Sequence, residues 1–524
     1  MPTDDPFPKH FNSLARVPLW ALVAYAVVRS VVAALHRPFW YDELCTLIIA
    51  HQPGSAAIWH AIAHAADGQP PLYYILERGI SAVFTNEQLG LRALSIVGFC
   101  LTILCVFVFV ERRSGGVAAL ACACIPFLTV LLFPYAVEAR PYAFLVGCIA
   151  LACVCYQRAT SRAWVVLLAV SLALAQGVHY YGVLAIIAFG LAEIAYCVRN
   201  RNVRSGVWIA YAIGLAPLAI YWPLLQQFKV VYGSHYWAEP LFLTAVGSYG
   251  FYWNISPLIG LLIAFGALVG SAFIRQPLTV ANAVSIRVEN SLIGEKVLII
   301  ALLLLPVIGF IVTGAAKGGF TYRYVLPGIL GFPLTVGYVI RPLSRRITGS
   351  IALLLFTVVA YRESSLWRDQ GSQLRGVQRP TAALEGLLGV AANSTLPIAV
   401  ADARDYLVFA YYTSPGLSSR LVYLADPRAS VAFIRTDSGD RQLLLLQHYY
   451  ALRIRDIDAF SNRIPSYLVF SRDKSKGQWL PAKLAHDGTI LRTLARDSAS
   501  TIYGVNLKPL GVIAEPSISH SDQR

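Results

Sequence analysis

Two adjacent carboxylates near the N-terminus are the residues of this sequence best placed to do chemistry. Asp42 and Glu43 follow an apolar run that ends near Leu35, and the aromatic residues 39–41 precede them directly. The simplest interpretation is a solvated pair that caps the next helix. However, carboxylates held at a bilayer surface beside aromatic side chains are desolvated, and such groups often serve a function. We therefore treat both residues as candidate catalytic carboxylates.

A second charged group lies in the segment Glu138-Ala139-Arg140-Pro141-Tyr142. This segment stands at a predicted helix start, where free N–H groups also favour anions. A local Glu138–Arg140 ion pair is the alternative, and such a pair contributes little at a surface. The segment is therefore a candidate site for an anionic substrate group.

Two further cations could hold a phosphate. Lys317 and Arg323 flank the glycine pair 318–319, and cations beside a flexible backbone can cradle an anion. A role in membrane topology is a weak explanation for these two cations. The positive-inside rule places such cations on the cytoplasmic side, whereas we predict Lys317 and Arg323 on the outer side. His179 stands among tyrosines after an earlier apolar run. A lone histidine in such a place is more often a packed interfacial residue than a ligand.

The composition indicates the elements that must hold these residues. Of 524 residues, 57% are hydrophobic and 14% are charged, and the mean hydropathy is +0.58. Soluble domains are about half apolar and about one quarter charged, so the sequence excludes a soluble enzyme and a single-span anchor. We predict an α-helical polytopic membrane protein with about 11 transmembrane helices. The apolar stretches are Val17–Leu35, Leu89–Val110, Val117–Phe133, Tyr142–Tyr156, Trp164–Gly177, Tyr181–Val198, Val207–Leu225, Pro257–Ile274, Val297–Thr313, Tyr324–Ile340 and Ile351–Tyr361.

The basic residues predict the orientation. With the N-terminus in the cytoplasm, most basic residues of the membrane part fall in inner loops, as the positive-inside rule requires. The net charge of +15 is then mostly topological, and it does not indicate a nucleic-acid partner. None of the nine cysteines lies after Cys197, so the sequence shows neither a disulfide framework nor a metal-type spacing. The first apolar run lacks a clean cleavage site and is predicted to stay as a span.

The first outer loop, residues 36–88, is long and contains the candidate carboxylates. Pro70-Pro71 can begin a helix that cannot extend backwards. The helix predicted after it, Leu72–Phe84, is too short to span and should lie along the membrane surface. Four aromatic residues of the loop fit an interfacial belt: Trp40, Trp59, Tyr73 and Tyr74.

An odd number of spans leaves residues 362–524 outside the cytoplasm. This tail holds 20 Lys or Arg residues and 15 Asp or Glu residues, and no run long enough to span. Strand-like runs alternate with a helix-like run at Tyr406–Tyr412, so we predict a small extracytoplasmic α/β domain. The predicted strands are Leu396–Ala401, Arg420–Leu424, Gln442–Leu446 and Tyr467–Ser471.

In its outer motifs the chain resembles the GT-C glycosyltransferases that use lipid-phosphate sugars, and in particular the branch with the protein O-mannosyltransferases and the lipid A aminoarabinose transferase. The resemblance covers the membrane part, from Val17 to about Tyr361, and the usual His-Pro-Pro is Gln69-Pro70-Pro71 here. The matching pieces, in order, are Trp40-x-Asp42-Glu43, Gln69-Pro70-Pro71-Leu72-Tyr73-Tyr74, Glu138-Ala139-Arg140-Pro141-Tyr142, His179-Tyr180 and Arg323-Tyr324-x-x-Pro327.

The resemblance implies a GT-C glycosyltransferase domain over residues 1–361, with its catalytic loop at 36–88, in the plasma (inner) membrane. Such an enzyme moves a sugar from a polyprenyl-phosphate donor to an acceptor hydroxyl at the outer face, with inversion. The leaving phosphate needs no general acid, so one carboxylate base suffices. Asp42 would be that base, and Glu43 would orient the loop or the acceptor.

The resemblance also implies roles for the other candidates. Arg140, Lys317 and Arg323 would stabilise the charge that develops on the phosphate. Glu138 would hold Arg140 in place or bind a metal with Asp42. No cofactor is required, and a divalent metal is possible but not implied. His60 and His64, four residues apart, could ligate one, but plain loop residues are the more common case for such a pair. The supporting residues are Tyr142, His179, Gln69 and Tyr73.

Two other classes of function stay open. A transporter or flippase of polyprenyl-linked sugars would share the lipid ligand, but it predicts paired repeats and polar residues near mid-bilayer, which the sequence does not display. A non-catalytic membrane scaffold would leave the outer acidic and basic clusters without a purpose. An O-antigen ligase-type transferase is the nearest alternative enzyme, and it lacks the early Asp-Glu loop. The motifs do not specify the sugar, the acceptor, the oligomeric state or the role of the C-terminal domain.

Overall fold

The structure is a computed structural model that describes residues 9–254, 256, 259, 262, 265–266, 269, 283–341, 343–375, 380–390 and 395–506. The chain divides into two compact units. The first contains Met1–Val377 with His448–Tyr450, and the second contains Gln378–Gln447 with Ala451–Arg524. The division at 377/378 falls after the last apolar run, 16 residues beyond the boundary expected at 361/362.

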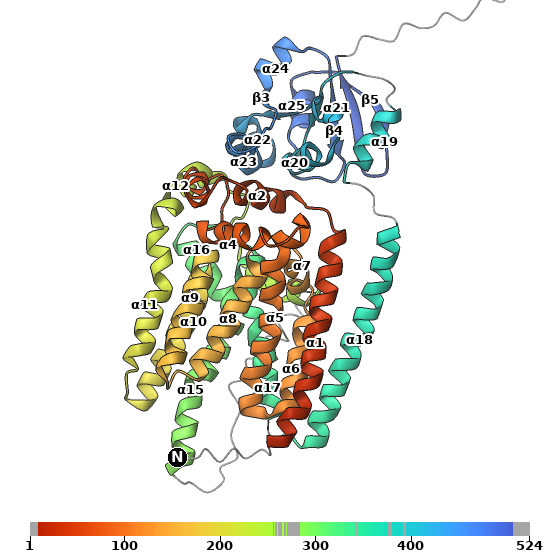
Figure 1. Ribbon diagram of the computed structural model, residues 1–524. Helices are drawn as coiled ribbons and strands as arrows, with labels where there is room; N and C mark the ends of the chain where they lie inside the picture. Colours follow the sequence, from red (N-terminus) through yellow and green to blue (C-terminus); the bar gives the residue numbers. More distant parts are fainter. Residues whose placement is uncertain are drawn as a thin grey trace, which may run out of the picture. The chain divides into compact units, whose positions relative to one another are not determined.

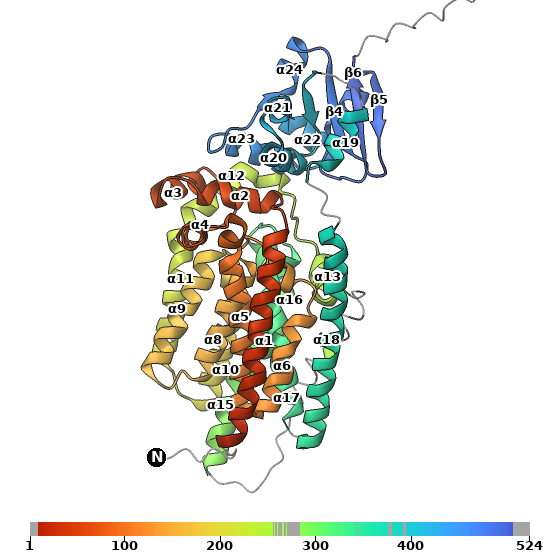
Figure 2. The ribbon, with the colours of Figure 1, turned by 45° about the vertical axis from the view of Figure 1, so that its right-hand side comes forward.

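The first unit is a bundle of long apolar helices with short helices at one end (Figure 1). The bundle is formed by α1 (Lys9–His36), α5 (Glu87–Ser114), α6 (Gly116–Leu128), α8 (Tyr142–Gln157), α9 (Arg162–Val178), α10 (Gly182–Asn200), α11 (Ser205–Ile220), α15 (Ala283–Leu303), α16 (Leu305–Ala315), α17 (Gly331–Ile340) and α18 (Arg345–Arg375). The short ones are α2 (Tyr41–Ala50), α3 (Ser55–Ala63), α4 (Pro71–Ser81), α7 (Leu132–Ala136), α12 (Trp222–Tyr232), α13 (Phe242–Trp253) and the 3₁₀ helices η1 (Gly233–His235) and η2 (Tyr322–Leu330). Figures 1 and 2 both show α2, α3, α4 and α12 gathered at the same end of the bundle.

Within the described residues, five helices are long and apolar enough to cross a membrane, and the number rises to seven if two bent helix pairs each form one span. The bent pairs are α11 with α12, at 45°, and the second half of α15 with α16, at 67°. Three shorter apolar helices, α6, α8 and α9, add to this set. The protein is therefore a multi-pass membrane protein. The predicted span at Pro257–Ile274 lies almost entirely outside the described residues.

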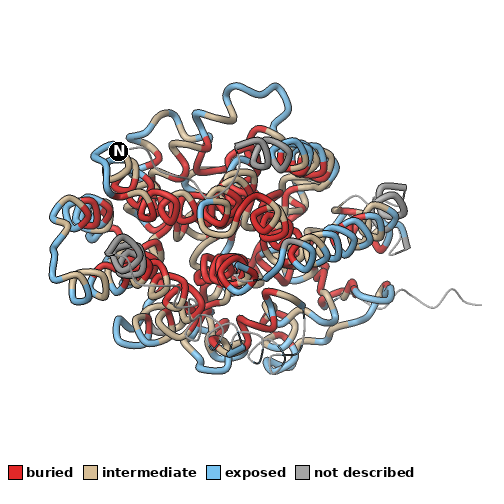
Figure 3. Tube along the Cα trace, turned by 90° about the horizontal axis from the view of Figure 1, so that it is seen from below, coloured by how far each residue is buried: buried red, intermediate tan, exposed pale blue. Residues whose placement is uncertain are grey.

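Helix α5 lies in the interior of the bundle and packs along α8 at very short range. A Cβ atom on Gly98 of α5 would stand 2.3 Å from the Cα atom of Phe144, and one on Gly147 of α8 would stand 2.6 Å from the carbonyl oxygen of Gly98. Only glycine permits this approach, as is common where helices pack in membranes. The buried segments lie inward and the exposed ones outward in Figure 3. The close α5–α8 contact fixes the start of α8, which Arg140 precedes by two residues.

A buried ion pair joins the first and last long helices. Arg29 of α1 is 3% exposed, and its Nε atom lies 2.5 Å from Oε2 of Glu363 in α18. The hydroxyl of Tyr25 donates to the same oxygen at 2.9 Å, and the guanidinium of Arg29 lies 3.4 Å from the ring centroid of Phe133. The partner of Arg29 therefore comes from more than 300 residues away. In an apolar surrounding, each charge is tolerated because the other compensates it.

This pair predicts a pattern of stability in matched variants. Arg29→Met and Glu363→Met should each lower the free energy of unfolding by about 2 kcal/mol, because each leaves one buried charge alone. The double variant should recover most of the loss, since both charges are gone. Thermal unfolding in detergent, followed by tryptophan fluorescence, measures all three. Additive losses in the double variant would contradict the predicted coupling.

The second unit is built on a six-stranded sheet with the order β3-β2-β1-β4-β6-β5. The strands are β1 (Ile398–Val400), β2 (Leu421–Ala425), β3 (Ile454–Asp456), β4 (Tyr467–Arg472), β5 (Leu491–Arg496) and β6 (Ser500–Val505). The first four are parallel and the last two join antiparallel at one edge, where Figure 2 shows β4, β6 and β5 side by side. The helices are α19 (Ala382–Val390), α20 (Ala403–Tyr412), α21 (Pro415–Ser418), α22 (Pro427–Ile434), α23 (Ser438–Leu446), α24 (Ile457–Arg463) and α25 (Leu480–His486).

The predicted elements of this unit agree with the structure except at one place. Three predicted strands coincide with β1, β2 and β4, and the helix at Tyr406–Tyr412 lies within α20. The strand predicted at Gln442–Leu446 is wrong, because these residues end helix α23. Leu443 and Leu446, three residues apart, are the ones that are buried, and this is the spacing of a helix face. A continuous apolar run does not by itself distinguish a strand from a helix.

Candidate functional site

Asp42 lies at the first turn of α2 and contacts two arginines from distant parts of the chain. Its Oδ2 atom lies 3.0 Å from Nη1 of Arg323, at the start of η2, and 3.9 Å from Nε of Arg140, just before α8. The side chain of Asp42 keeps 17% of its surface exposed, against 6% for that of Arg140. Three separate predicted motifs therefore meet at one point, and the carboxylate is the more accessible member.

A second carboxylate holds Arg140 from the other side. Oδ2 of Asp67 lies 3.2 Å from Nη1 of Arg140 and accepts a hydrogen bond of 2.7 Å from the hydroxyl of Tyr74. Burial disfavours the charge of Arg140, but Asp67 and Asp42 outweigh it, so the pKa of Arg140 lies well above its ordinary value. Asp67 was not among the predicted site residues. Its place two residues before the Gln69-Pro70-Pro71 motif was the signal that could have found it.

Glu43, the neighbour of Asp42, has a different environment. It is fully buried, and its Oε1 and Oε2 atoms accept from Nε and Nη2 of Arg92 in α5 at 2.7 and 2.9 Å. Oε1 also accepts from the backbone N–H of Ala139 at 2.8 Å. Arg92 in turn donates to three backbone carbonyls, one in the last turn of α1 and two in the segment between α1 and α2. Glu43 thus joins α2, α5 and the segment before α8, so its carboxylate can position the loop but has no surface for an acceptor.

Glu138 pairs with Arg37 and not with Arg140. Oε1 of Glu138 accepts from Nη2 of Arg37 at 2.8 Å. Burial raises the pKa of Glu138, and Arg37 opposes this shift. The local Glu138–Arg140 pair considered from the sequence is absent from this described segment, because the backbone turns between the two residues. The Ser95 hydroxyl donates to both of their carbonyl oxygens, at 2.7 and 2.9 Å, and so holds this turn.

His179 follows α9 and is packed among aromatic rings. It is 2% exposed, its Nδ1 accepts from the backbone N–H of Tyr181 at 3.1 Å, and the rings of Tyr142, Tyr181 and Tyr324 lie 5.4 to 5.6 Å from its own. Burial, with Arg140 and Arg323 as further causes, lowers the pKa of His179 to about 3. The imidazole is therefore neutral at physiological pH and serves as a polar member of an aromatic wall.

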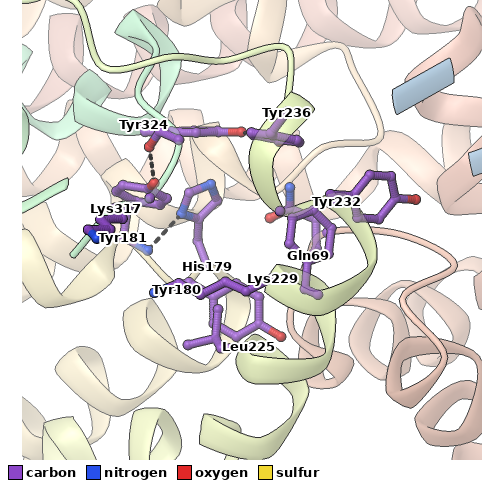
Figure 4. Close-up of a pocket in the computed structure, with 15 residues that line it drawn as sticks. Gln69, His179, Tyr180, Tyr181, Leu225, Lys229, Tyr232, Tyr236, Lys317 and Tyr324 are labelled. Carbon is purple, nitrogen blue, oxygen red and sulfur yellow. Dashed lines mark hydrogen bonds between the residues drawn. The ribbon is translucent and has the colours of Figure 1, made fainter. Parts of the chain in front are cut away.

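A pocket of about 120 Å³ lies beside this wall (Figure 4). Three sequence-predicted residues, Gln69, His179 and Lys317, line it, and no carboxylate does. Tyr324 stacks on Tyr181 with a centroid distance of 4.4 Å, and its hydroxyl lies 3.1 Å from that of Tyr236. The full lining is Gly68, Gln69, His179, Tyr180, Tyr181, Leu225, Phe228, Lys229, Tyr232, Gly233, Tyr236, Lys317, Gly318, Gly319 and Tyr324.

The pocket has a second lysine that the sequence motifs did not suggest. Lys229, in α12, donates from Nζ to the carbonyl oxygen of Ala316 at 2.8 Å, so it lies beside Lys317. Both lysine side chains are exposed. Helix α12 is one arm of a pair bent by 45°, and four of its residues line the pocket: Leu225, Phe228, Lys229 and Tyr232. Aromatic faces with cations at the rim can bind a sugar that carries a phosphate.

The prediction that four aromatic residues of the first loop form an interfacial belt is wrong for two of them. Tyr73 and Tyr74 of α4 are fully buried, whereas Trp59 of α3 is 40% exposed. Because α4 packs under α2 and against α5, its tyrosines face the interior rather than the headgroups. Tyr74 holds Asp67, so its burial serves the site.

Helix α4 also buries Glu77, which predicts a pH-dependent stability effect. Burial raises the pKa of Glu77 well above its ordinary value, with Glu43 adding to the shift and Tyr73 opposing it. Between the ordinary and the raised pKa, the folded protein holds one more proton than the unfolded chain, so this residue costs stability as the pH rises. We expect Glu77→Gln to raise the unfolding midpoint by a few degrees at neutral pH, with a smaller gain below the ordinary carboxylate pKa. A gain that grows on acidification would contradict this.

The described residues contain no group of three or more His, Cys, Asp or Glu side chains that could hold a metal ion. His60 and His64 lie with ring centroids 4.1 Å apart on α3 and at its end. They form a pair only, and Glu138 is engaged with Arg37.

Two of three comparisons find known proteins similar to this chain. Residues 68–222 match the family described as dolichyl-phosphate-mannose-protein mannosyltransferase. No curated protein sequence matches the chain significantly. The crystal structure of ArnT from Cupriavidus metallidurans bound to undecaprenyl phosphate is 15% identical, with a TM-score of 0.54 over 93% of this chain and 98% of that one. The apo structure of the same protein gives the same values.

The family match contains Gln69, Arg140 and His179, and the structural match extends over nearly the whole of both chains. These findings show that the chain shares the fold of ArnT and that residues 68–222 are similar to the dolichyl-phosphate-mannose-protein mannosyltransferase family.

Proposed function

We propose that this protein is an inverting glycosyltransferase that moves a sugar from a polyprenyl-phosphate donor to an acceptor hydroxyl at the outer face of the plasma membrane. The observation that carries the proposal is the junction of Asp42 with Arg323 and Arg140 beside an aromatic pocket with two rim lysines. The structural relative bound to undecaprenyl phosphate supports the class of donor.

In the proposed reaction, Asp42 removes the proton of the acceptor hydroxyl. The acceptor oxygen forms a bond to the anomeric carbon while the bond between that carbon and the phosphate oxygen breaks. The electron pair leaves with the polyprenyl phosphate, which gains one negative charge. No proton need be given to such a leaving group, so the single accessible carboxylate suffices.

The charge that develops on the phosphate calls for fixed cations nearby. A guanidinium has five N–H donors, so Arg323 can hold Asp42 through Nη1 and still donate to the phosphate. Arg140 is held by Asp67 and Asp42 and is thus preorganised rather than mobile. Lys317 would meet the phosphate from the pocket rim, with Gln69, Tyr142 and His179 lining the approach. Glu43, Glu138 and Tyr73 act indirectly in this proposal, through the backbone and packing that they hold.

We propose that the reaction does not require a divalent metal ion. The orientation, with the N-terminus in the cytoplasm and the second unit outside, is part of the proposal and rests on the distribution of basic residues.

Lipid mass spectrometry of the native host tests the activity. A strain without this protein should accumulate a polyprenyl-phosphate sugar, whose mass names the donor, and the wild-type gene should remove it. Purified protein in liposomes should then transfer that sugar. If no such lipid accumulates and the purified protein does not turn over the donor, the transporter and scaffold hypotheses gain support.

Arg323 provides a sharper test of the phosphate role. Arg323→Ala should lower kcat/KM by about 10²- to 10³-fold, because one fixed cation at the leaving group is lost. Arg362→Ala is a matched control that should leave kcat/KM unchanged. Arg362 lies in α18 and donates to the carbonyl oxygen of Leu128 in α6, and neither residue belongs to the proposed site. An Arg323→Ala enzyme with unchanged kcat/KM would refute the role.

A further inference from the structure

The second unit contains a charged cleft that the proposed reaction does not use. Its volume is about 620 Å³, and every residue that lines it belongs to this unit. The charged residues of its lining are Asp402, Arg404, Asp405, Arg472, Lys474 and Lys476.

The cleft lies at the place where the sheet topology favours ligands. Strands β2 and β3 continue from β1 on one side, whereas β4 pairs with β1 on the other. Connections that leave β1 and β4 therefore run in opposite directions and open a crevice at the carboxyl ends of these two strands. In open α/β sheets, ligands bind at this switch point. The lining residues at 402–405 follow β1 and those at 472–476 end or follow β4.

The two carboxylates of the cleft are already paired, and Asp402 is buried. Asp402, whose side chain is 5% exposed, caps α20 and binds Arg404 at 2.7 Å and the Ser475 hydroxyl. Asp405 binds Nε of Arg472 through both oxygens, at 2.8 and 2.9 Å. Both carboxylates are thus neutralised by arginines of the cleft. The N-terminus of α20 is capped by Asp402 and is not available to bind a ligand.

The cations, by contrast, reach the surface of the cleft. The side chains of Arg404 and Arg472 are 55% and 38% exposed, although each is bound to a carboxylate. Lys474 and Lys476 are exposed and form no ion pair within the described residues. The intervening Asp473 points elsewhere, to Arg496 at 2.7 Å and to the Thr501 hydroxyl. Four cations against two carboxylates leave the cleft with an excess positive charge.

We propose that this cleft binds an anionic ligand through a phosphate or carboxylate group, with Lys474 and Lys476 supplying the charge that no internal carboxylate neutralises. The exposed N–H donors of Arg404 and Arg472 would complete the contact. The second unit is then a binding module of its own, with a ligand distinct from the sugar donor. This inference does not depend on the proposed reaction.

The test uses the full-length protein in a maltoside detergent, with two probes. Inorganic phosphate is followed by ³¹P line broadening, and glucuronate by saturation-transfer difference NMR. Wild type should bind at least one of them, and Lys474→Ala/Lys476→Ala should weaken that binding about tenfold. Lys474→Arg/Lys476→Arg should keep it, because the charge is retained.

Two controls separate this site from others. Lys483→Ala/Arg492→Ala removes the same charge elsewhere in the unit, and Arg323→Ala disables the proposed donor site; both should bind as wild type does. Binding of phosphate only, or of glucuronate only, would assign the class of ligand. The proposal is overturned if wild type binds neither probe, if the lysine double variant binds like wild type, or if Lys483→Ala/Arg492→Ala loses binding equally. Loss of binding in Arg323→Ala alone would place the probe in the donor pocket and overturn it as well.

Discussion

Asp42→Asn should abolish glycosyl transfer, with kcat lower by about 10³- to 10⁴-fold, while the amount of folded protein in the membrane stays unchanged. Asparagine keeps the size of the side chain and an oxygen that can accept from Nη1 of Arg323, 3.0 Å away in the wild type. It loses only the capacity to take a proton. The effect should therefore fall on the chemical step and leave donor binding largely intact.

Asp67→Asn is the matched comparison, since Asp67 contacts Arg140 from the other side but lies deeper, with a side chain 6% exposed against 17% for Asp42. We expect Asp67→Asn to impair donor binding more than kcat, because it loosens Arg140 without removing the base. Steady-state kinetics with reconstituted enzyme distinguish the two variants. Normal turnover by Asp42→Asn, or equal kcat losses in both variants, would exclude Asp42 as the specific base.

Arg92→Ala should cause the largest loss of stability among single substitutions near the site, about 3 to 5 kcal/mol. Arg92 is fully buried, and its guanidinium binds both oxygens of Glu43 and three backbone carbonyls. Alanine leaves the Glu43 carboxylate buried without a counter-charge. Because Glu43 also holds the N–H of Ala139, the loss should extend to the positions of Asp42 and Arg140.

Glu43→Gln tests the same junction from the other side. Glutamine keeps the shape and one acceptor, so its effect on the unfolding midpoint should be smaller than that of Arg92→Ala. Arg92→Lys keeps the charge but not the fork of donors and should be intermediate. Thermal unfolding in detergent ranks the three variants. If Arg92→Ala unfolds at the wild-type midpoint, the junction does not hold the loop.

Much of the membrane part was predictable because lipid imposes simple rules. Apolar runs at Leu89–Val110 and Tyr181–Val198 correspond to α5 and α10, since a chain in a bilayer must satisfy its backbone hydrogen bonds within helices. Short runs were harder. The stretch at Val117–Phe133 breaks after Leu128, where α6 ends, and no periodicity marks such a break.

For the candidate site, the residue types and their order along the chain pointed to Asp42, Arg140 and Arg323, because charges beside apolar runs must have a reason to be there. Their partners could not be predicted. Glu138 stands two residues from Arg140 but pairs with Arg37, and Asp67 takes the place expected of Glu138. Sequence spacing says nothing about such pairs, since they join segments about 70 to 100 residues apart.

The sequence by itself thus determined that the protein is a multi-pass membrane protein with acidic and basic residues beside its apolar runs, because composition and hydrophobic length act locally along the chain. Only the tertiary structure decided which carboxylate is accessible and which is structural, since Asp42 and Glu43 are neighbours whose environments are set by Arg323 and Arg92 from distant helices. Burial and pairing are properties of the assembled bundle. The same holds for the cleft of the second unit, which exists because β4 returns to the far side of β1.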